Sequence, residues 1–589
     1  MIPCKYAVGK RESARRKLRE LEDKVQSYEA LLRELQNTVD LQSKHAIQKA
    51  LAGSLTPTTE TSEDIDIDSE DESHHRSGDE TSDNPPETLS EDINTLSINN
   101  PNGFMGRGSE VSWLKLLRHE LNIDDNKENE HLREIRRMKG DAVELNGPID
   151  MVGVTYHLDD IDLSLDGSNV QIDPYLIPPK PIADTLVSAY FCTVHPLVPI
   201  ISKPEFMAIY NRLNTEGPMV LSRHDLMVIN LVFAAGGRCL ETLGRDPQWP
   251  HMECFNRARV LGALDGGVLF GIPMLHDVQA MGLTGLYLLG SKHTNRAWNV
   301  VGLGIRLAHG LGLHLRTEDP KLDPQQREMR VRVYYALVYL EATLCLVTGR
   351  PTTLQAFDMA GPVPRSALIT DGSPDAYYSA LMKLSMIIAV VQSQLYASRS
   401  AGVTRTKKWG ALSDAICSLR SRLDHWKSEL PANLDFEITP NDPDVVIQRS
   451  DLALRYYNTM ILIYFPCLAR RDAPQGSWDC LNAARSILSL IVLHTDNDTP
   501  QYLPWWCLPH YLVCAEVVVM LAIVRHDDLD LCEQLVEEVR KPLRWLRHIS
   551  RLDLVAQRTE IQLGKMLGHV LDRLAERRRQ AAAITRFQS

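Results

Sequence analysis

The feature that most constrains the fold is an almost uninterrupted apolar run from Val333 to Val347, in the middle of the chain. Gly349, Arg350 and Pro351 follow shortly after its end. Helix-forming residues that stop at Gly-Arg-Pro predict a single helix, because proline disfavours helical geometry in the residue before it. The run is shorter than the ~20 residues that cross a bilayer. We therefore expect it to be the central, buried helix of a large helical domain.

Glu341 is the only charged residue inside this run. A buried acid with a perturbed pKa can mark an active site. A buried charge is more often paired, because an isolated charge in a protein interior is strongly destabilising. The position therefore favours a structural acid that forms an ion pair with a nearby arginine, and an active-site acid is the alternative.

The sequence has helical periodicity from about residue 179 almost to its end. In the segment 296–314, for example, the apolar residues Trp298, Val301, Ile305 and Ala308 recur at steps of three and four, which indicates one apolar helix face. The sequence contains no alternating strand pattern of any length, and its apolar content of 44 % is ordinary for a globular core. The predicted fold class is all-α, with one large multi-helix domain over residues 179–582.

The sequence contains no complete catalytic or cofactor-binding motif of several common classes. The chain contains no phosphate-binding loop, no Gly-x-Ser-x-Gly elbow, and no complete dinucleotide-binding or zinc-protease motif. Its eleven cysteines are scattered without a CxxC pair, which predicts reduced, mostly buried thiols in the cytosol or nucleus. His309 and His314 are five residues apart, which does not place them on one helix face for a metal. We expect no catalytic residues and no membrane segment.

The amino-terminal residues are strongly basic, with Glu12 as the only acid among the first 19 residues. Such a cluster neutralises nucleic-acid phosphates or serves in nuclear localisation, and a solvated tail is the alternative. The predicted DNA-contacting residues are Lys5, Lys10, Arg11, Arg15, Arg16, Lys17 and Arg19.

Residues 18–42 carry a seven-residue apolar repeat that is typical of a short coiled coil. Lys17 and Lys24 would face Glu22 and Glu29 of a second chain, which favours a parallel dimer. A single amphipathic helix lying on the main domain is the alternative. The predicted dimer contacts are Leu18, Val25 and Leu32 at the a positions, and Leu21, Tyr28 and Leu35 at the d positions.

The segment between the coil and the helical domain is acidic at first. Residues 43–110 combine low hydrophobicity with runs of acids, which predicts a disordered linker. A plain solvated spacer is the favoured interpretation, and a weak activation segment is the alternative. Residues 111–178 contain short helical patterns, from Glu110 to Leu121 and from Glu128 to Met138, which we expect to dock on the main domain.

The central stretch resembles a known family. Arginines before the apolar run, the pair Tyr334-Tyr335, Glu341, Gly349-Arg350-Pro351 and the arm Pro362-Val363-Pro364 are similar to the fungal-specific transcription factor domain, the middle homology region of zinc-binuclear-cluster (Zn(2)-C6) regulators. The segments 296–314 and 171–206 are similar to other parts of that domain. The resemblance implies an all-helical regulatory domain with these structural signature residues: Arg330, Glu341, Gly349, Arg350 and Pro351.

In the same family, a basic segment and a dimerisation coil follow the sixth cysteine of a cluster that holds two zinc ions. Cys4 matches the position of that last cysteine, and the other five would precede Met1. One thiolate cannot build a tetrahedral zinc site. We therefore expect Cys4 to be a metal ligand only if an upstream cysteine cluster exists. The resemblance implies two zinc ions in the intact family module, and we expect this chain to hold none. Either the gene starts further upstream or the module has been lost.

The resemblance and the amino-terminal pattern together predict a nuclear, DNA-binding, homodimeric regulator of RNA polymerase II-type transcription that is not an enzyme. Its expected partners are DNA, a second copy of the chain and transcriptional co-regulators. The alternative is a regulator without its own base readout that acts through dimerisation or protein partners. A metabolite-binding or enzymatic helical protein is the third hypothesis.

Overall fold

The computed structural model describes residues 105–123, 157–159, 163, 172–262, 272–315, 321–354, 374–396, 405–437, 443–468, 473–497 and 500–588. These residues all belong to the second of the two units into which the chain divides, residues 84–589. The basic segment, the coil and Cys4 lie outside the described residues, as does the helical pattern at 128–138. The predictions for them remain predictions.

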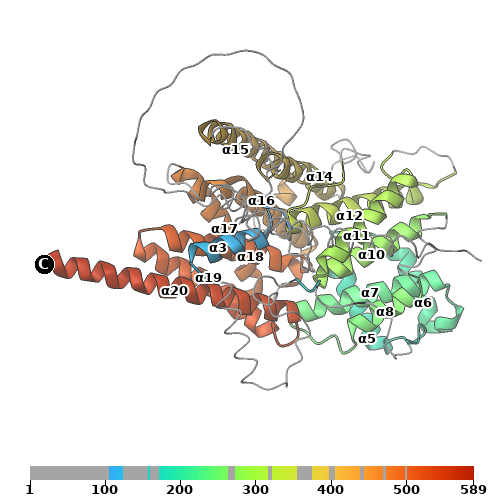
Figure 1. The fold of residues 1–589 in the computed structure, drawn as a ribbon. Coiled ribbons are helices and arrows are strands. Elements are labelled where there is room, and N and C mark those ends of the chain that lie inside the picture. The colour runs from blue at the N-terminus through green and yellow to red at the C-terminus, as the bar shows by residue number, and fades with distance from the viewer. Residues whose placement is uncertain are drawn as a thin grey trace, which may run out of the picture. The chain divides into compact units, whose positions relative to one another are not determined.

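The described residues form α-helices with short 3-10 and π turns and contain no strand, which confirms the all-α prediction (Figure 1). The α-helices are α3 Glu110–Glu120, α5 Lys180–Thr193, α6 Lys203–Glu216, α7 Arg223–Thr242, α8 His251–Val260, α10 Leu275–Gly290, α11 Thr294–Gly310, α12 Pro324–Thr348, α14 Pro374–Val391, α15 Arg405–Ser428, α16 Pro443–Leu468, α17 Pro474–Asp496, α18 Leu508–Arg525, α19 Leu529–Ile549 and α20 Leu554–Gln588. The short turns are η4 Pro218–Val220, η5 Gln392–Tyr396, η6 Ala432–Leu434 and η7 Pro500–Tyr502.

The apolar run forms the second half of α12, as predicted. Asp323 and Gln326 form a capping box at the start of the helix, in which the main-chain amide of Gln326 donates to the Asp323 carboxylate at 2.7 Å. At the other end Gly349 adopts a left-handed conformation, with φ of 64°, which glycine tolerates at a helix C-terminus. Every residue from Val333 to Val347 is buried except the partly buried Ala342. The residues at its two ends thus determine where this helix begins and stops, and its apolar composition explains why it is buried.

Helix α12 lies between two groups of helices. On one side it packs against α10 and α11. Helix α10 also contacts α7, which in turn contacts α5 and α8. On the other side it packs against α14, which contacts α15 and α16. Helix α18 is the second central element, because it contacts α16, α17, α19, α20 and also α3 (Figure 1). Close helix approach needs glycine at Gly236 in α7, where an added Cβ would lie 2.1 Å from the carbonyl oxygen of Leu186 in α5.

Three helices have the length and composition to cross a membrane: α12, the segment Ala376–Tyr396, and α18. In these helices 83 %, 56 % and 89 % of the most apolar window is buried against the rest of the protein. Packing inside the domain therefore accounts for the apolar composition of α12 and α18, as expected for core helices. In the described residues ten cysteines are free and eight of them are buried, in agreement with the expected burial of most thiols.

A fully buried ion pair links α12, α14 and α16. Arg455 Nε lies 2.9 Å from an oxygen of Asp451, and both side chains have 0 % exposure. The hydroxyls of Tyr339 and Tyr377 donate to the two Asp451 oxygens at 3.0 and 2.8 Å. Arg455 also donates to Thr343 at 2.8 Å and lies 4.2 Å from the centre of the Tyr339 ring. Each charged group thus has several partners, which is the condition under which a buried pair is tolerated.

Candidate functional site

Helix α3 is built into the core although it precedes the main domain in the chain. Its first turn is capped by Ser109, and Trp113 stacks on Phe465 of α16 with ring centroids 4.2 Å apart. Ser109 and Glu110 have 0 % exposure. The predicted linker boundary at residue 110 is therefore wrong: residues 105–110 belong to the folded domain, because tertiary contacts bury a segment that is polar in sequence. The prediction that a helix near Glu110–Leu121 docks on the domain is confirmed.

Gly349, the first residue of the Gly-Arg-Pro signature, lies where α3 enters the core. The amide of Gly106 donates to the carbonyl of Thr348 at 2.8 Å. A Cβ on Gly349 would lie 2.9 Å from the carbonyl oxygen of Gly106 and from the amide nitrogen of Ser109. A side chain at position 349 would therefore clash with the start of α3 as well as strain the left-handed backbone.

The two signature arginines join α12 to both ends of α11. Arg330 donates to the carbonyl of Leu311, at the carboxyl end of α11, at 2.7 Å. Arg350 bonds to Asn295 at the amino end of α11 and lies 5.4 Å from the centre of the Trp298 ring. Pro351, the last signature residue, is exposed. The structure thus places Arg330 and Arg350 in packing roles.

Glu341 is buried but has a different partner from the one predicted. One oxygen accepts hydrogen bonds from the amide and the hydroxyl of Thr353, at 2.9 and 2.8 Å, and the other has no hydrogen-bond partner among the described residues. Burial raises its pKa, against the opposing effect of the Thr353 hydrogen bonds and the positive charge of Arg306. The predicted ion pair is therefore wrong, since in the described part of the chain the carboxyl group makes no ion-pair contact. It instead anchors the backbone after Gly-Arg-Pro.

Replacing Glu341 by alanine should lower the free energy of unfolding by about 1–3 kcal/mol, because the amide and the hydroxyl of Thr353 both lose their charged, buried acceptor. Thermal unfolding of the full chain, followed by circular dichroism, measures this loss. Glu341→Gln is the matched control, because its carbonyl oxygen can still accept from Thr353, and we expect a smaller loss. An unchanged melting temperature for Glu341→Ala would contradict this role of the carboxyl group.

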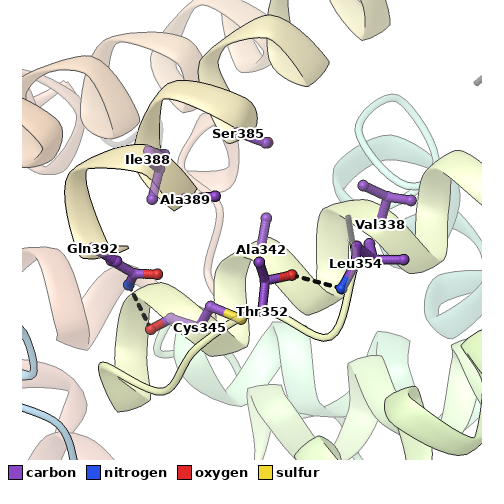
Figure 2. Close-up of a pocket in the computed structure, with 9 residues that line it drawn as sticks. All are labelled: Val338, Ala342, Cys345, Thr352, Leu354, Ser385, Ile388, Ala389 and Gln392. Atoms are coloured by element: carbon purple, nitrogen blue, oxygen red, sulfur yellow. Dashed lines mark hydrogen bonds between the residues drawn. The ribbon is translucent and has the colours of Figure 1, made fainter. Parts of the chain in front are cut away.

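A small cavity lies between α12 and α14 (Figure 2). Its empty space is about 260 Å³, and its walls include Cys345, Thr352 and Gln392. Gln392 begins the π turn η5 and donates to the carbonyl of Cys345 at 2.8 Å. Burial raises the pKa of Cys345 well above its usual value, so the thiol is a poor nucleophile. The 260 Å³ includes space open to solvent, and the enclosed part has room for only about one water molecule, far less than a small-molecule ligand needs. It is therefore not the site that we favour.

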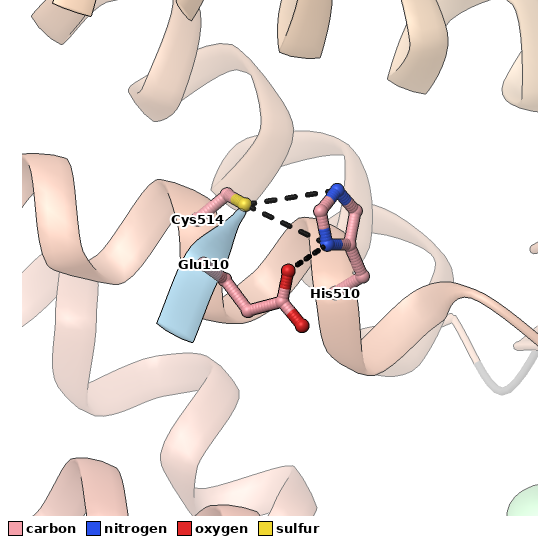
Figure 3. A group of neighbouring side chains, drawn as sticks. All are labelled: Glu110, His510 and Cys514. Atoms are coloured by element: carbon pink, nitrogen blue, oxygen red, sulfur yellow. Dashed lines mark hydrogen bonds and ion pairs between the residues drawn. The ribbon is translucent and has the colours of Figure 1, made fainter. Parts of the chain in front are cut away.

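The most unusual group of side chains surrounds Glu110 (Figure 3). Its two carboxylate oxygens contact His157 Nε2 at 3.0 Å and His510 Nδ1 at 2.7 Å. Burial alone would raise the pKa of Glu110, but His510 and His157 together hold it well below its usual range. The side chains of Glu110 and His157 have 0 % exposure and that of His510 has 1 %. The cluster therefore holds an ionised carboxylate between two imidazoles, away from solvent.

Cys514 completes this cluster. It lies four residues after His510 on α18, and its sulfur is 3.8 Å from His510 Nδ1 and 3.7 Å from Nε2. Burial raises the pKa of this thiol well above its usual value, and the negative charge of Glu110 adds to the effect. Among the described residues, Glu110, His510 and Cys514 form the group whose ligand atoms lie close enough together to hold a metal ion, all within 4.8 Å of one another.

The segment 157–159 ties the cluster to α11. His157 Nδ1 lies 2.7 Å from the hydroxyl of Thr294, and the amide of Leu158 donates to the carbonyl of Lys292 at 2.9 Å. Both carboxylate oxygens of Asp159 accept from the amide of Asn295 at 3.1 Å, at the amino end of α11. The cluster thus joins three parts of the chain: α3, the segment 157–159 and α18.

Sequence reasoning missed these residues. Glu110 and His510 are 400 positions apart, and only the spacing of His510 and Cys514, one helical turn, carries a local signal. His309 and His314 were expected to point apart, but their ring centroids are 4.7 Å apart. Helix α11 ends at Gly310, so the chain turns and brings His314 back against His309.

Comparison with known proteins agrees with the resemblance seen in the sequence. Residues 187–428 match the family model described as the fungal specific transcription factor domain. The transcription regulator galc of Aspergillus niger is 24 % identical, over 93 % of this chain and 76 % of the relative. The Fusaridione A cluster transcription factor fsdR of Fusarium heterosporum is 26 % identical, over 58 % of this chain and 68 % of the relative. The transcriptional activator protein acu-15 of Neurospora crassa is 26 % identical, over 54 % of this chain and 34 % of the relative.

The helical fold, the family match and the names of these relatives together support transcription regulation as the class of function. Residues 187–428 are thus similar to the fungal specific transcription factor domain, the domain that the sequence resembles.

Proposed function

We propose that this transcription regulator binds DNA as a homodimer in the nucleus and that its helical domain regulates that activity. The observation that carries the proposal is the alignment of 93 % of the chain with a transcription regulator, together with the family match over residues 187–428. The basic residues before the heptads supply the charge that phosphate binding needs. The coil would set the spacing of the two DNA half-sites.

The residues of this chain do not fit a two-zinc cluster. The described helical domain contains ten cysteines, none of them in a CxxC pair and eight of them buried, and Cys4 alone matches the family's cysteine pattern. No step of DNA recognition is therefore assigned to zinc here. The second candidate function is a regulator that acts through dimerisation or protein partners without its own base readout.

The coil should hold the chain as a dimer, because the heptad pattern and the lysine–glutamate pairs agree on one register. Sedimentation of the full chain should give twice the mass of the monomer. Replacing Leu21 and Leu35 together by glutamate should give a monomer, whereas Ser27→Glu with Asn37→Glu, on the outer face of the predicted coil, should leave the dimer intact. A monomeric unmodified chain at micromolar concentration would rule out the coil.

Binding of the full chain to DNA should weaken steeply with salt. If three or four of the seven basic residues in each chain contact phosphate, a dimer should show a log–log salt slope of roughly −5 to −7. Arg15→Gln with Arg16→Gln should flatten the slope by up to about 3.6, that is about 0.9 for each of four lost contacts. The matched control is Lys541→Gln with Arg579→Gln, which replaces two exposed basic residues of the helical domain.

The same titration, repeated with several unrelated duplexes, separates the two candidate functions. Phosphate contacts alone predict equal affinity for all duplexes, since base edges carry the sequence information. A strong preference for one duplex would support base readout by this chain. Absence of binding even at low salt would contradict the proposed DNA contacts and favour action through protein partners.

A further inference from the structure

We propose that Glu110, His510 and Cys514 form a structural binding site for one divalent metal ion of borderline softness, zinc being the natural candidate. The site would fasten α3 to α18. It is separate from the family's zinc cluster, and the proposal does not depend on DNA binding.

The donor set fits this metal class. Zinc binds carboxylate oxygen, imidazole nitrogen and thiolate sulfur, usually with four ligands in a tetrahedron. Bond lengths of about 2.0–2.3 Å at tetrahedral angles place ligand atoms about 3.3–3.6 Å apart. Cys514 Sγ lies 3.8 Å from His510 Nδ1 and 3.7 Å from Nε2, so the thiol would have to turn toward the Nδ1 side of the ring to share a metal with it. The 2.7 Å from His510 Nδ1 to Glu110 would have to widen by about 0.6 Å, which a side-chain rotation can supply.

The helix geometry also favours a site. His510 and Cys514 are four residues apart on α18, so both side chains project from the same face of that helix. Helix α3 brings the carboxylate of Glu110 to them from its first turn (Figure 3). A divalent ion bound by one carboxylate, one thiolate and one neutral imidazole would be charge-neutral, which lowers the cost of burying the ion.

Hydrogen bonding alone leaves part of this arrangement unexplained. His510 Nε2 lies 3.3 Å from the side-chain nitrogen of Asn458, while the buried carbonyl oxygen of Asn458 has no hydrogen-bond partner among the described residues. A metal on Nδ1 would leave the proton on Nε2. Turning the Asn458 amide would then present its oxygen to that proton, the usual support for a metal-binding histidine. His157, 3.0 Å from the other oxygen of Glu110, would act as a positioning residue.

Binding would release the thiol proton of Cys514, because the thiolate is the form that binds metal, and the proton of the neutral His510 would move from Nδ1 to Nε2. No redox change or further reactant is required. Since all three ligands are buried, the ion would enter during folding or when α3 is released from the core. A metal at this place would therefore make the attachment of α3 depend on metal supply.

The test is the metal content of the full-length protein, purified with zinc present and then passed over a weak chelator. We expect about one zinc per chain by elemental analysis, falling to about none in Cys514→Ala. Cys480→Ala is the matched control, because Cys480 is equally buried in α17 and is not part of the cluster. Circular dichroism of each variant shows whether it is folded.

A second measurement does not depend on any variant. The unmodified protein loaded with Co²⁺ should show the near-ultraviolet absorption of a thiolate–Co²⁺ bond, and a strong chelator should lower its melting temperature. The absence of bound metal in the unmodified protein, or the same metal content in folded Cys514→Ala as in Cys480→Ala, would overturn the proposal. Metal bound without the thiolate absorption would place the ion elsewhere and would overturn it as well.

Discussion

Replacing Arg455 by alanine should lower the free energy of unfolding by about 3–5 kcal/mol, because it leaves the buried carboxylate of Asp451 without its counter-charge. Arg455 and Asp451 both have 0 % exposure, and among the described residues only the hydroxyls of Tyr339 and Tyr377 would remain as partners of the carboxylate. Loss of the arginine also removes the hydrogen bond to Thr343, which joins α16 to α12. Chemical denaturation of the full chain, followed by circular dichroism, measures the change.

Arg485→Ala provides the matched comparison. Arg485 also pairs with a carboxylate, that of Glu538 at 2.7 Å, but its side chain is 35 % exposed and that of Glu538 is 29 % exposed. An ion pair with this access to water contributes about 0–1 kcal/mol. A loss for Arg455→Ala no greater than that for Arg485→Ala would mean that the Asp451 network does not hold α12 and α16 together.

Replacing Glu516 by glutamine should increase stability at neutral pH, with an effect that grows as the pH rises. Glu516 lies in α18 with 0 % exposure, and neither carboxyl oxygen has a hydrogen-bond partner among the described residues. Burial raises the pKa of this group well above its usual value. The folded protein therefore keeps a proton that the unfolded chain loses above a pH of about 4.5.

The sign of the pH dependence follows from this proton. Where the native state binds more protons than the unfolded state, stability falls as the pH rises, by at most about 1.4 kcal/mol per pH unit for one group. Glutamine has no such proton, so the advantage of Glu516→Gln should appear above pH ~4.5 and increase up to the pKa of the folded state. Melting temperatures of both proteins between acid and neutral pH measure it. For the exposed control Glu216→Gln, the melting temperature should change with pH as it does in the unmodified protein. If the melting temperature of Glu516→Gln also ran parallel to that of the unmodified protein, the burial argument would be contradicted.

Much of the fold could be predicted from the sequence because helices depend on neighbours in the chain. The capping box at Asp323 and Gln326, the apolar run and the stop at Gly349 lie within one segment, and α12 begins and ends as they indicate. The same local patterns identified α3 and the all-α fold class. The resemblance that rested on Gly349, Arg350 and their surroundings was confirmed by the family match.

The partners of buried polar groups could not be predicted in this way. The sequence indicated that Glu341 needs a partner, but not that the backbone after Gly-Arg-Pro returns to bring Thr353 against it. A helix was predicted at α3, yet the linker was extended to residue 110, because the polar Ser109 and Glu110 carry no sign of burial. Packing against α18, the segment 157–159 and the end of α12 buries them.

The candidate site shows most clearly the difference between what local sequence determines and what tertiary contacts decide. The sequence by itself determined where helices form and placed His510 and Cys514 one turn apart on one of them. The tertiary structure alone decided that Glu110, His157 and His510 meet, because three segments far apart in the chain converge there. Periodicity records which face of a helix is apolar. It does not record which distant segment covers that face, since many arrangements of the same helices bury equal apolar area.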